Sequence, residues 1–212
     1  MSEIVTTTCT TSDGLTLEAE LARAAGSPRA AAVLCHPHPQ FGGTMRSIVI
    51  GALFDALPEA GVTCLRFNFR GVEGSEGFHD SGSGEQLDVL AAIATLDAQI
   101  DASLTMLLAG WSFGADLTLA TASERVAGWF AIAPPLRSVP DFSAVARDPR
   151  PKLLALAEHD EIRDAEWVVD ATRDWVATDI EIIGGASHYF VGRTNRIVES
   201  ALRFVDRLTS PT

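Results

Sequence analysis

The sequence predicts an α/β fold with a mainly parallel, twisted sheet of about eight strands and helices on both faces. Short and nearly uninterrupted apolar runs recur along the chain, as expected for strands that are buried on both faces of a parallel sheet. Amphipathic stretches lie between these runs and predict crossover helices. A chain of 212 residues can bury roughly 70–75% of its unfolded surface, so we expect a single domain over residues 1–212.

The chain opens with two alternating segments, Ile4–Thr10 and Leu15–Ala22, on either side of the turn Ser12-Asp13-Gly14. This pattern predicts an antiparallel hairpin. The buried strands are expected at Ala30–Cys35, Val62–Phe67, Leu104–Ala109, Val126–Ala133, Lys152–Ala157 and Asp179–Ile183. The helices are expected at Ser47–Ala60, Gly84–Gln99, Phe113–Ser123, Asp164–Val176 and Asn195–Leu208.

Composition argues against two classes of partner. The chain carries 16 Lys and Arg against 28 Asp and Glu, which gives a formal net charge of −12. Binding to nucleic acid or to an anionic membrane surface depends on clustered Lys and Arg. We therefore expect neither of them as a partner.

The cysteines and the hydropathy pattern predict a cytoplasmic protein. Cys9, Cys35 and Cys64 are few, odd in number and set in apolar runs, which favours reduced and buried thiols over a disulfide framework. The first residues lack the basic and apolar segments of a signal peptide. The apolar runs are also shorter than the ~20 residues of a transmembrane helix.

The first motif with chemical meaning is Gly110-Trp111-Ser112-Phe113-Gly114, which joins a predicted strand to a predicted helix. In this context the G-x-S-x-G pattern predicts a sharp turn, in which flanking glycines let the serine hydroxyl project at the edge of the sheet. No other serine of the sequence has glycine two residues away on both sides. The pattern predicts Ser112 as a nucleophile, with a tight structural turn as the alternative.

A serine nucleophile needs a base that takes its proton and a carboxylate that orients the base. In this architecture the three groups follow in the order serine, acid, histidine, each after a later strand. Asp160 follows the strand Lys152–Ala157 and His188 follows the strand Asp179–Ile183, so the order is fulfilled. Glu158 is the rival acid. The non-catalytic alternatives are Asp160 as a helix cap and His188 as a hydrogen-bonded core histidine.

Acyl transfer also requires N–H donors for the oxyanion that forms on the attacked carbonyl. One donor is expected to be the backbone N–H of Phe113, directly after the nucleophile. The second is expected from the loop after the third strand, whose two prolines have no N–H. This leaves the backbone of His38 as the expected donor, with Gln40 or Phe41 as alternatives.

The pair His36 and His38 could also suggest a metal site. Residues two apart on an extended chain point to opposite sides, and no third ligand is related to them by spacing. We therefore expect no metal, and we expect His36 to form a hydrogen bond beneath the site.

Five segments carry a resemblance to a known family. They are His36-Pro37-His38-Pro39-Gln40-Phe41-Gly42-Gly43-Thr44-Met45, Phe67-Asn68-Phe69-Arg70-Gly71-Val72-Glu73-Gly74-Ser75-Glu76-Gly77, Gly110-Trp111-Ser112-Phe113-Gly114, His159-Asp160-Glu161 and His188-Tyr189-Phe190. With these segments, in order over nearly the whole chain, the sequence resembles the α/β-hydrolase superfamily. Within it, the sequence is similar to small bacterial serine hydrolases without a lid that carry a His-Pro-His-Pro…Gly-Gly-Thr-Met loop.

The resemblance implies Ser112 as nucleophile, Asp160 as acid and His188 as base. The sequence departs from the family pattern at Glu73, where glycine is usual, and this difference concerns the loop and not the triad. For Arg70, in the same loop, we expect an architectural and not a catalytic role.

Larger members of this superfamily insert a helical cap after the strand that corresponds to Val126–Ala133. Here only Pro134–Arg150 fills the interval, and its four prolines oppose a long helix. We therefore expect no cap domain and an open site. Loop side chains that could form an apolar acyl pocket, or could simply pack beneath loops, are Phe41, Leu136, Phe142, Tyr189 and Phe190.

The sequence thus predicts a serine hydrolase that cleaves small-molecule carboxylic esters, or thioesters, through an acyl-enzyme on Ser112. No cofactor is expected, because serine acyl transfer needs neither metal nor nucleotide and the sequence contains no nucleotide-binding fingerprint. Two alternatives remain open at this point. One is a non-catalytic scaffold that binds a ligand or a partner protein, and the other is an acyltransferase or perhydrolase with the same triad.

Overall fold

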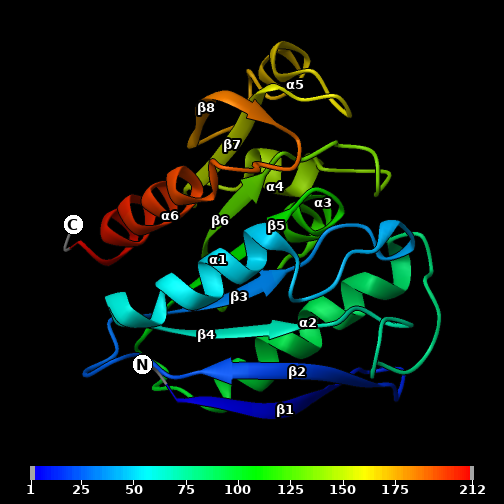
Figure 1. Ribbon diagram of the computed structural model, residues 1–212, viewed down its shortest axis with the longest axis vertical. Coiled ribbons are helices and arrows are strands. Elements are labelled where there is room, and N and C mark those ends of the chain that lie inside the picture. The colour runs from blue at the N-terminus through cyan, green and yellow to red at the C-terminus, as the bar shows by residue number, and fades with distance from the viewer. Residues whose placement is uncertain (1–2, 211–212) are drawn as a thin grey trace.

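The computed structural model describes residues 3–210 and contains an eight-stranded sheet in the order β1-β2-β4-β3-β5-β6-β7-β8 (Figure 1). The strands are β1 (Ile4–Thr10), β2 (Thr16–Ala22), β3 (Ala30–Cys35), β4 (Val62–Phe67), β5 (Thr105–Trp111), β6 (Val126–Ile132), β7 (Lys152–His159) and β8 (Thr178–Ser187). β2 runs antiparallel to both β1 and β4, and all other neighbours are parallel. The predicted hairpin and the mainly parallel sheet are confirmed.

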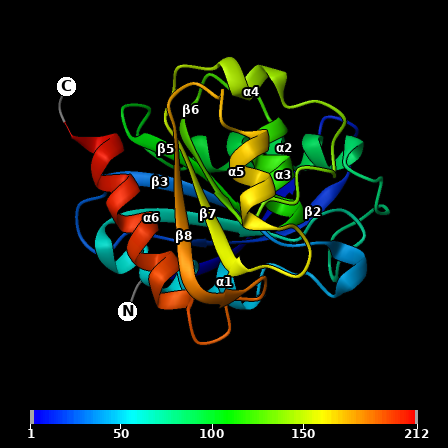
Figure 2. The same cartoon turned by 90° about the horizontal axis from the view of Figure 1, so that it is seen from above.

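Helices cover both faces of this sheet (Figure 2). The helices α1 (Ile48–Ala56) and α6 (Thr194–Thr209) lie on one face. The other face carries α2 (Ser83–Asp97), α3 (Phe113–Ala120), α4 (Ser143–Arg147) and α5 (Ala165–Ala171). Successive residues of the central strands alternate between the two apolar cores, because strand side chains point to opposite faces: Leu107 packs with α1 and α6, whereas Leu108 packs with α2 and α3.

The predicted helix Ser47–Ala60 is interrupted. α1 ends at Ala56, and a separate 3₁₀ helix, η2, covers Pro58–Ala60. Pro58 has no N–H to continue the hydrogen-bond ladder, and its ring opposes a helical turn before it. The predicted helix Phe113–Ser123 likewise ends at Ala120, because Thr121 is extended (φ −91°, ψ 111°).

The last two strands are longer than predicted. β7 continues to His159 and β8 to Ser187, with a register irregularity between Ala157 and His159. The sequence pattern ends earlier because the extra residues, apart from Ala186, are polar or glycine. These extensions carry the chain to the two predicted triad positions, 160 and 188, each of which follows directly on a strand end.

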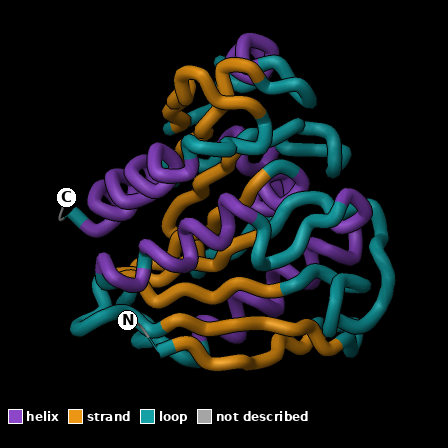
Figure 3. The backbone as a smooth tube through the Cα atoms, viewed as in Figure 1, coloured by secondary structure: helices purple, strands orange, loops and turns teal. Residues whose placement is uncertain are grey.

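Long connections gather at the side of the molecule to which β3 and β4 point (Figure 3). The loop after β3 contains the short 3₁₀ helix η1 (Pro39–Phe41). The connection from β6 to β7 contains only the five-residue helix α4, so no cap is inserted there. No separate cap domain therefore covers the carboxyl ends of the parallel strands. Open sheets place their chemistry at these ends.

Three cysteines, Cys9, Cys35 and Cys64, are free and buried, as predicted. Burial raises the pKa of Cys9 to about 11 and that of Cys35 to about 12, so these thiols stay protonated and unreactive. Within residues 3–210, no helix is long and apolar enough to cross a bilayer.

Candidate active site

Ser112 lies in the turn that joins β5 to α3. Its backbone has φ 56° and ψ −119°, a conformation that residues other than glycine rarely adopt. Its N–H donates a hydrogen bond of 2.8 Å to the carbonyl of Ile132 on the neighbouring strand β6. The surrounding sheet thus holds Ser112 in a strained conformation, as is common at functional positions.

The two glycines of the motif are required by close backbone contacts. A Cβ atom on Gly110 would lie 2.2 Å from the carbonyl oxygen of Gly114, and one on Gly114 would lie 2.3 Å from the carbonyl oxygen of Cys35. Neither distance can accommodate a side chain. The start of α3 therefore packs directly on the end of β3, which brings Ser112 beside the loop after β3.

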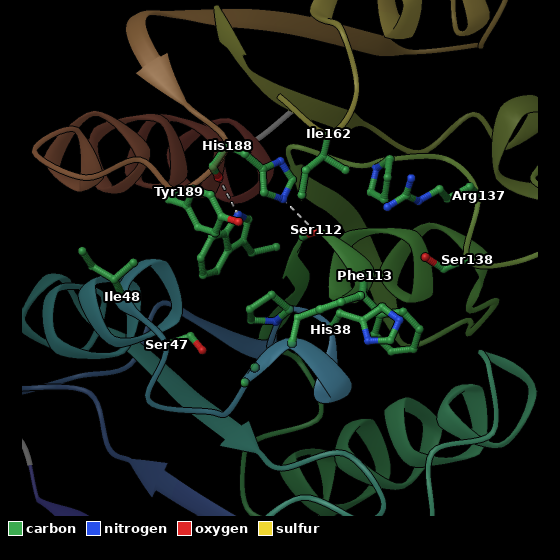
Figure 4. A pocket seen from close by; sticks show the side chains of 16 residues that line it. His38, Ser47, Ile48, Ser112, Phe113, Arg137, Ser138, Ile162, His188 and Tyr189 are labelled. Carbon is green, nitrogen blue, oxygen red and sulfur yellow. Dashed lines mark hydrogen bonds between the residues drawn. The ribbon is translucent and has the colours of Figure 1, made fainter. Parts of the chain in front are cut away.

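Ser112, His188 and Asp160 form a continuous hydrogen-bonded chain. Ser112 Oγ lies 2.9 Å from His188 Nε2 (Figure 4), and His188 Nδ1 lies 2.8 Å from Asp160 Oδ2. An ionised carboxylate only accepts hydrogen bonds, so the ring proton belongs on Nδ1. Nε2 is then free to accept the proton of the serine hydroxyl. The exposed fractions of Ser112 and His188 are 8% and 2%.

The environment of Asp160 keeps it ionised. Burial raises its pKa, but the hydrogen bond with His188 and the N–H groups of Arg163 and Ile162 lower it by more, so the net shift is downward. Oδ1 accepts both of these backbone N–H groups, at 3.0 and 2.9 Å.

Two alternatives for the acid position are Glu158 as the carboxylate next to the histidine and Asp160 as a helix cap, and neither contact is present in the structure. Glu158 is exposed, and its Oε2 accepts the N–H of Gly185 at 2.7 Å. The start of α5 is capped by the side chain of Asp164, which accepts from Trp167 N–H, and not by Asp160.

The loop after β3 presents one free backbone N–H beside Ser112. The N–H of Gln40 donates to His38 Nδ1, and that of Phe41 donates to the carbonyl of His38. The N–H groups of His38 and Phe113 have no acceptor within residues 3–210. Both residues line the cavity at Ser112. A close approach fixes the loop, because a Cβ atom on Gly43 would lie 2.1 Å from the carbonyl oxygen of Pro37.

His36 lies beneath this loop and is fully buried. Its Nε2 accepts the N–H of Phe69 at 3.0 Å, and its Nδ1–H donates to the carbonyl of Pro37 at 2.6 Å. Burial lowers its pKa to about 3, so it is neutral and couples the loops after β3 and β4. No cluster of His, Cys, Asp and Glu in residues 3–210 could hold a metal ion.

With this geometry in place, we compared the chain with known proteins. No model of a known protein family matches the sequence. An uncharacterized protein of Rickettsia prowazekii, RP471, is 33% identical over 84% of this chain and 79% of its own length. An alpha-beta serine hydrolase homologue from Coxiella burnetii has a similar structure, with 31% identity, a TM-score of 0.84 and coverage of 96% of this chain and 98% of that one.

The protein XC6422 of Xanthomonas campestris, described as an α/β serine hydrolase without a lid, is 30% identical. Its structure matches with a TM-score of 0.84 over all of this chain and 97% of its own. The chain belongs to the α/β-hydrolase family. The predicted fold is thereby confirmed, including the missing cap.

In this α/β-hydrolase, Ser112 opens into a cavity of about 470 Å³ at the carboxyl ends of the strands (Figure 4). The cavity lies between the loop after β3, the loop after β6 and the two loops that carry Asp160 and His188. Its lining consists of Pro37, His38, Phe41, Gly42, Gly43, Ser47, Ile48, Trp111, Ser112, Phe113, Pro135, Arg137, Ser138, Ile162, His188 and Tyr189.

Two of the five predicted acyl-pocket residues, Phe41 and Tyr189, line this cavity, and three do not. Phe190 has a positive φ of 51°, which turns its side chain into the core, where it is 0% exposed. Phe142 packs against Trp175 with ring centroids 6.2 Å apart. Leu136 packs against the core on the α2 and α3 face. These three residues follow the alternative that the sequence left open, since interior packing takes up their apolar surface.

Two residues that hold the main chain of His188 were missed by the sequence reasoning. Glu161 Oε2 accepts its N–H at 3.0 Å, and Trp111 Nε1 donates to its carbonyl at 3.1 Å. Both are neighbours of predicted triad residues, so adjacency was the available signal. Arg70 is buried between Asp88 (2.7 Å) and Asp13 (3.0 Å), which agrees with the predicted architectural role.

Proposed function

We propose that this α/β-hydrolase cleaves carboxylic esters, or thioesters, through an acyl-enzyme on Ser112. The observation that carries the proposal is the chain of two hydrogen bonds from Ser112 Oγ through His188 to Asp160. Such a chain makes a serine hydroxyl nucleophilic. The cavity that Ser112 faces gives a small substrate access to it.

In the proposed first half-reaction, Ser112 Oγ attacks the carbonyl carbon while its proton passes to His188 Nε2. The resulting imidazolium is stabilised by Asp160, whose charge remains in place because its pKa is lowered. When the tetrahedral intermediate collapses, His188 returns the proton to the departing alcohol or thiol. An acyl group then remains on Ser112.

In the second half-reaction, water takes the place of the alcohol. His188 removes a proton from the water, the oxygen attacks the acyl carbonyl, and the proton returns to Ser112 as the acid leaves. The same residues thus act twice with their roles reversed, which is the usual cycle of a serine hydrolase.

The oxyanion of both intermediates would be held by the N–H groups of Phe113 and His38. These groups are supported as donors because neither has an acceptor of its own in the described residues, whereas those of Gln40 and Phe41 are occupied. Removing one such donor in a serine hydrolase costs about 10²–10³ in turnover.

The test is intact-mass analysis after incubation with a fluorophosphonate, which reacts with activated serines. Wild type should gain one phosphonyl group per chain, whereas Ser112→Ala and His188→Ala should gain none. Circular dichroism serves as the control that both variants are folded. A folded wild type that remains unlabelled, or labelling that persists in Ser112→Ala, would contradict the proposal.

A further inference from the structure

Arg137 is an unpaired cation on the wall of the active-site cavity. It lies in the loop after β6, lines the cavity together with Ser112, and is exposed. Among the arginines of residues 3–210, only Arg137 and Arg147 have a side chain without a hydrogen bond or an ion pair. Arg147 lies on α4, outside the cavity.

The backbone beneath Arg137 is fixed by a buried carboxylate. Asp116 on α3 is 0% exposed, and its two oxygens accept the N–H groups of Leu136, Arg137 and Ser138 at 2.8, 2.9 and 2.8 Å. The helix that begins directly after Ser112 therefore also holds the loop that carries Arg137. The base of this side chain is thus positioned relative to the nucleophile.

Within residues 3–210, no carboxylate forms a hydrogen bond or an ion pair with the side chain of Arg137. The cavity lining contains no Asp or Glu, although the chain as a whole has a net charge of −12. The buried carboxylates near the cavity already have partners: Asp116 binds the loop backbone, Asp160 binds His188 and its own turn, and Glu85 contacts His79 and the N–H of Gly82. Figure 4 shows the Arg137 side chain extending from its loop toward the Ile162 side of the cavity.

The positive charge of Arg137 also acts inside the cavity. The pKa of His38 is lowered, first by burial, then by His79 and to a smaller extent by Arg137, against an opposing effect of the Glu85 carboxylate. His38 is the residue proposed to donate its N–H to the oxyanion, and it lines the same cavity as Arg137. An arginine in such a place is suited to a bidentate contact with a planar anion.

We propose that Arg137 binds a carboxylate on the substrate, so that the preferred esters of this enzyme are anionic. This inference rests on the proposed function, because it names the substrate class of the same site. The carboxylate could belong to the acyl part or to the alcohol part of the ester. The chemistry of recognition is the same in both cases, and the experiment separates them.

Two matched pairs of esters test the proposal. For the acyl part, the p-nitrophenyl monoester of adipic acid is compared with its methyl-capped, neutral analogue. For the alcohol part, 4-acetoxybenzoate is compared with its methyl ester. The quantity measured is kcat/KM for each ester in wild type, Arg137→Gln, Arg137→Lys and the control Arg147→Gln, which removes the same charge outside the cavity.

Wild type should favour the anionic member of at least one pair. Arg137→Gln should lower kcat/KM for that ester by about tenfold or more, mainly through KM, which is the scale of a lost charge-assisted hydrogen bond. Activity on the neutral partner should change by less than about twofold, because no contact with it is lost. Arg137→Lys should keep part of the preference, and Arg147→Gln should behave as wild type.

Equal activity of wild type on both members of each pair, or a preference that persists in Arg137→Gln, would overturn the inference while leaving the proposed hydrolase function intact. Failure of the hydrolase function would instead show as absent fluorophosphonate labelling and no turnover of any ester. In that case calorimetric titration of Ser112→Ala with the adipate monoester and with 4-acetoxybenzoate still decides the role of Arg137. Binding of either ester that is lost in the double variant with Arg137→Gln supports it, and no binding of either ester refutes it.

Discussion

The indole Nε1 of Trp111 donates a hydrogen bond of 3.1 Å to the main-chain carbonyl of His188. The residue directly before the proposed nucleophile thus holds the residue that carries the proposed base. Both ends of this bond are buried, so the serine turn and the histidine loop are fixed to each other independently of the Ser112–His188 contact itself.

Trp111→Phe removes this bond and keeps most of the ring volume. A buried carbonyl left without its donor costs about 1–3 kcal/mol in the free energy of unfolding, and a displaced His188 should lower kcat by about tenfold to a hundredfold. Urea unfolding and ester hydrolysis measure the two effects. Trp175→Phe, remote from the cavity, is the matched control. An unchanged kcat in Trp111→Phe would show that the bond is structural only.

Substitution of the two carboxylates at the end of β7, Glu158 and Asp160, should affect kcat very differently. Asp160→Asn should lower kcat by about 10⁴, because the amide no longer orients the histidine in the correct tautomer. Glu158→Gln should have little effect, since Glu158 contacts the N–H of Gly185 and not the imidazole. Steady-state kinetics on one ester decide between them. The acid is misassigned if Glu158→Gln is the more damaging change.

The strained backbone at Ser112 should lower the free energy of unfolding, and two substitutions at this position can measure the effect. Glycine adopts φ 56° without the steric cost that alanine has there. We therefore expect Ser112→Gly to have a higher free energy of unfolding than Ser112→Ala, by about 1–2 kcal/mol. Both variants lack the hydroxyl, so the comparison isolates the backbone. Equal denaturation midpoints in urea would mean that the turn stores no strain.

Glu73 has a φ of 47°, a backbone conformation that glycine adopts without steric cost. Here the carboxylate Oε2 accepts from Asn68 Nδ2 at 2.8 Å and Arg46 Nη1 at 3.0 Å. Both Glu73→Ala and Glu73→Gly lose these contacts, but only alanine keeps the strain. Glu73→Ala should be the less stable by about 1 kcal/mol in thermal or urea unfolding. The reverse order would contradict this account.

Acidification should destabilise the fold through His36. Its pKa is about 3 in the folded protein against an ordinary value of 6.5, so below pH 6.5 the unfolded chain binds a proton that the folded chain does not. The free energy of unfolding should therefore fall by about 1.4 kcal/mol per pH unit from this residue alone until pH approaches about 3.

The check is urea unfolding at pH 7, 6 and 5 for wild type and for His36→Gln, which retains a donor and an acceptor but does not titrate. The free energy of unfolding should fall more steeply with decreasing pH in wild type than in His36→Gln, and the difference is the contribution of His36. Parallel pH dependences in the two proteins would show that His36 does not set this slope.

Much of the fold was predictable because strands buried on both faces have a simple signature, and six of them, with the hairpin, were located within a few residues. The ends of β7 and β8 were not predictable from the sequence. Their last residues belong to the sheet because His159 pairs with Ser187 across the two strands, and no apolar pattern marks that pairing. The end of α1 has a signal in the sequence, because Pro58 opposes continuation of the helix, whereas the apolar run through Leu57 favours one longer helix.

The structure places Ser112, Asp160 and His188 together as the spacing and order predicted. The cavity wall was harder to predict, because side chains of irregular loops have no periodicity that tells inside from outside. Phe190 illustrates this: a positive φ at that residue turns it away from the cavity that its neighbour Tyr189 lines. Arg137 and Asp116 went unnoticed for the same reason, since their roles depend on contacts between α3 and the loop after β6.

The three bonds from Asp116 to the loop after β6 all use main-chain N–H groups as donors. Main-chain donors are the same for every residue type except proline. Substitutions at 137 and 138, which line the cavity, can therefore change the chemistry of its wall while the course of the loop is preserved. This arrangement would let the substrate preference change at little cost in folding, with the buried Asp116 carboxylate as the fixed anchor of the loop.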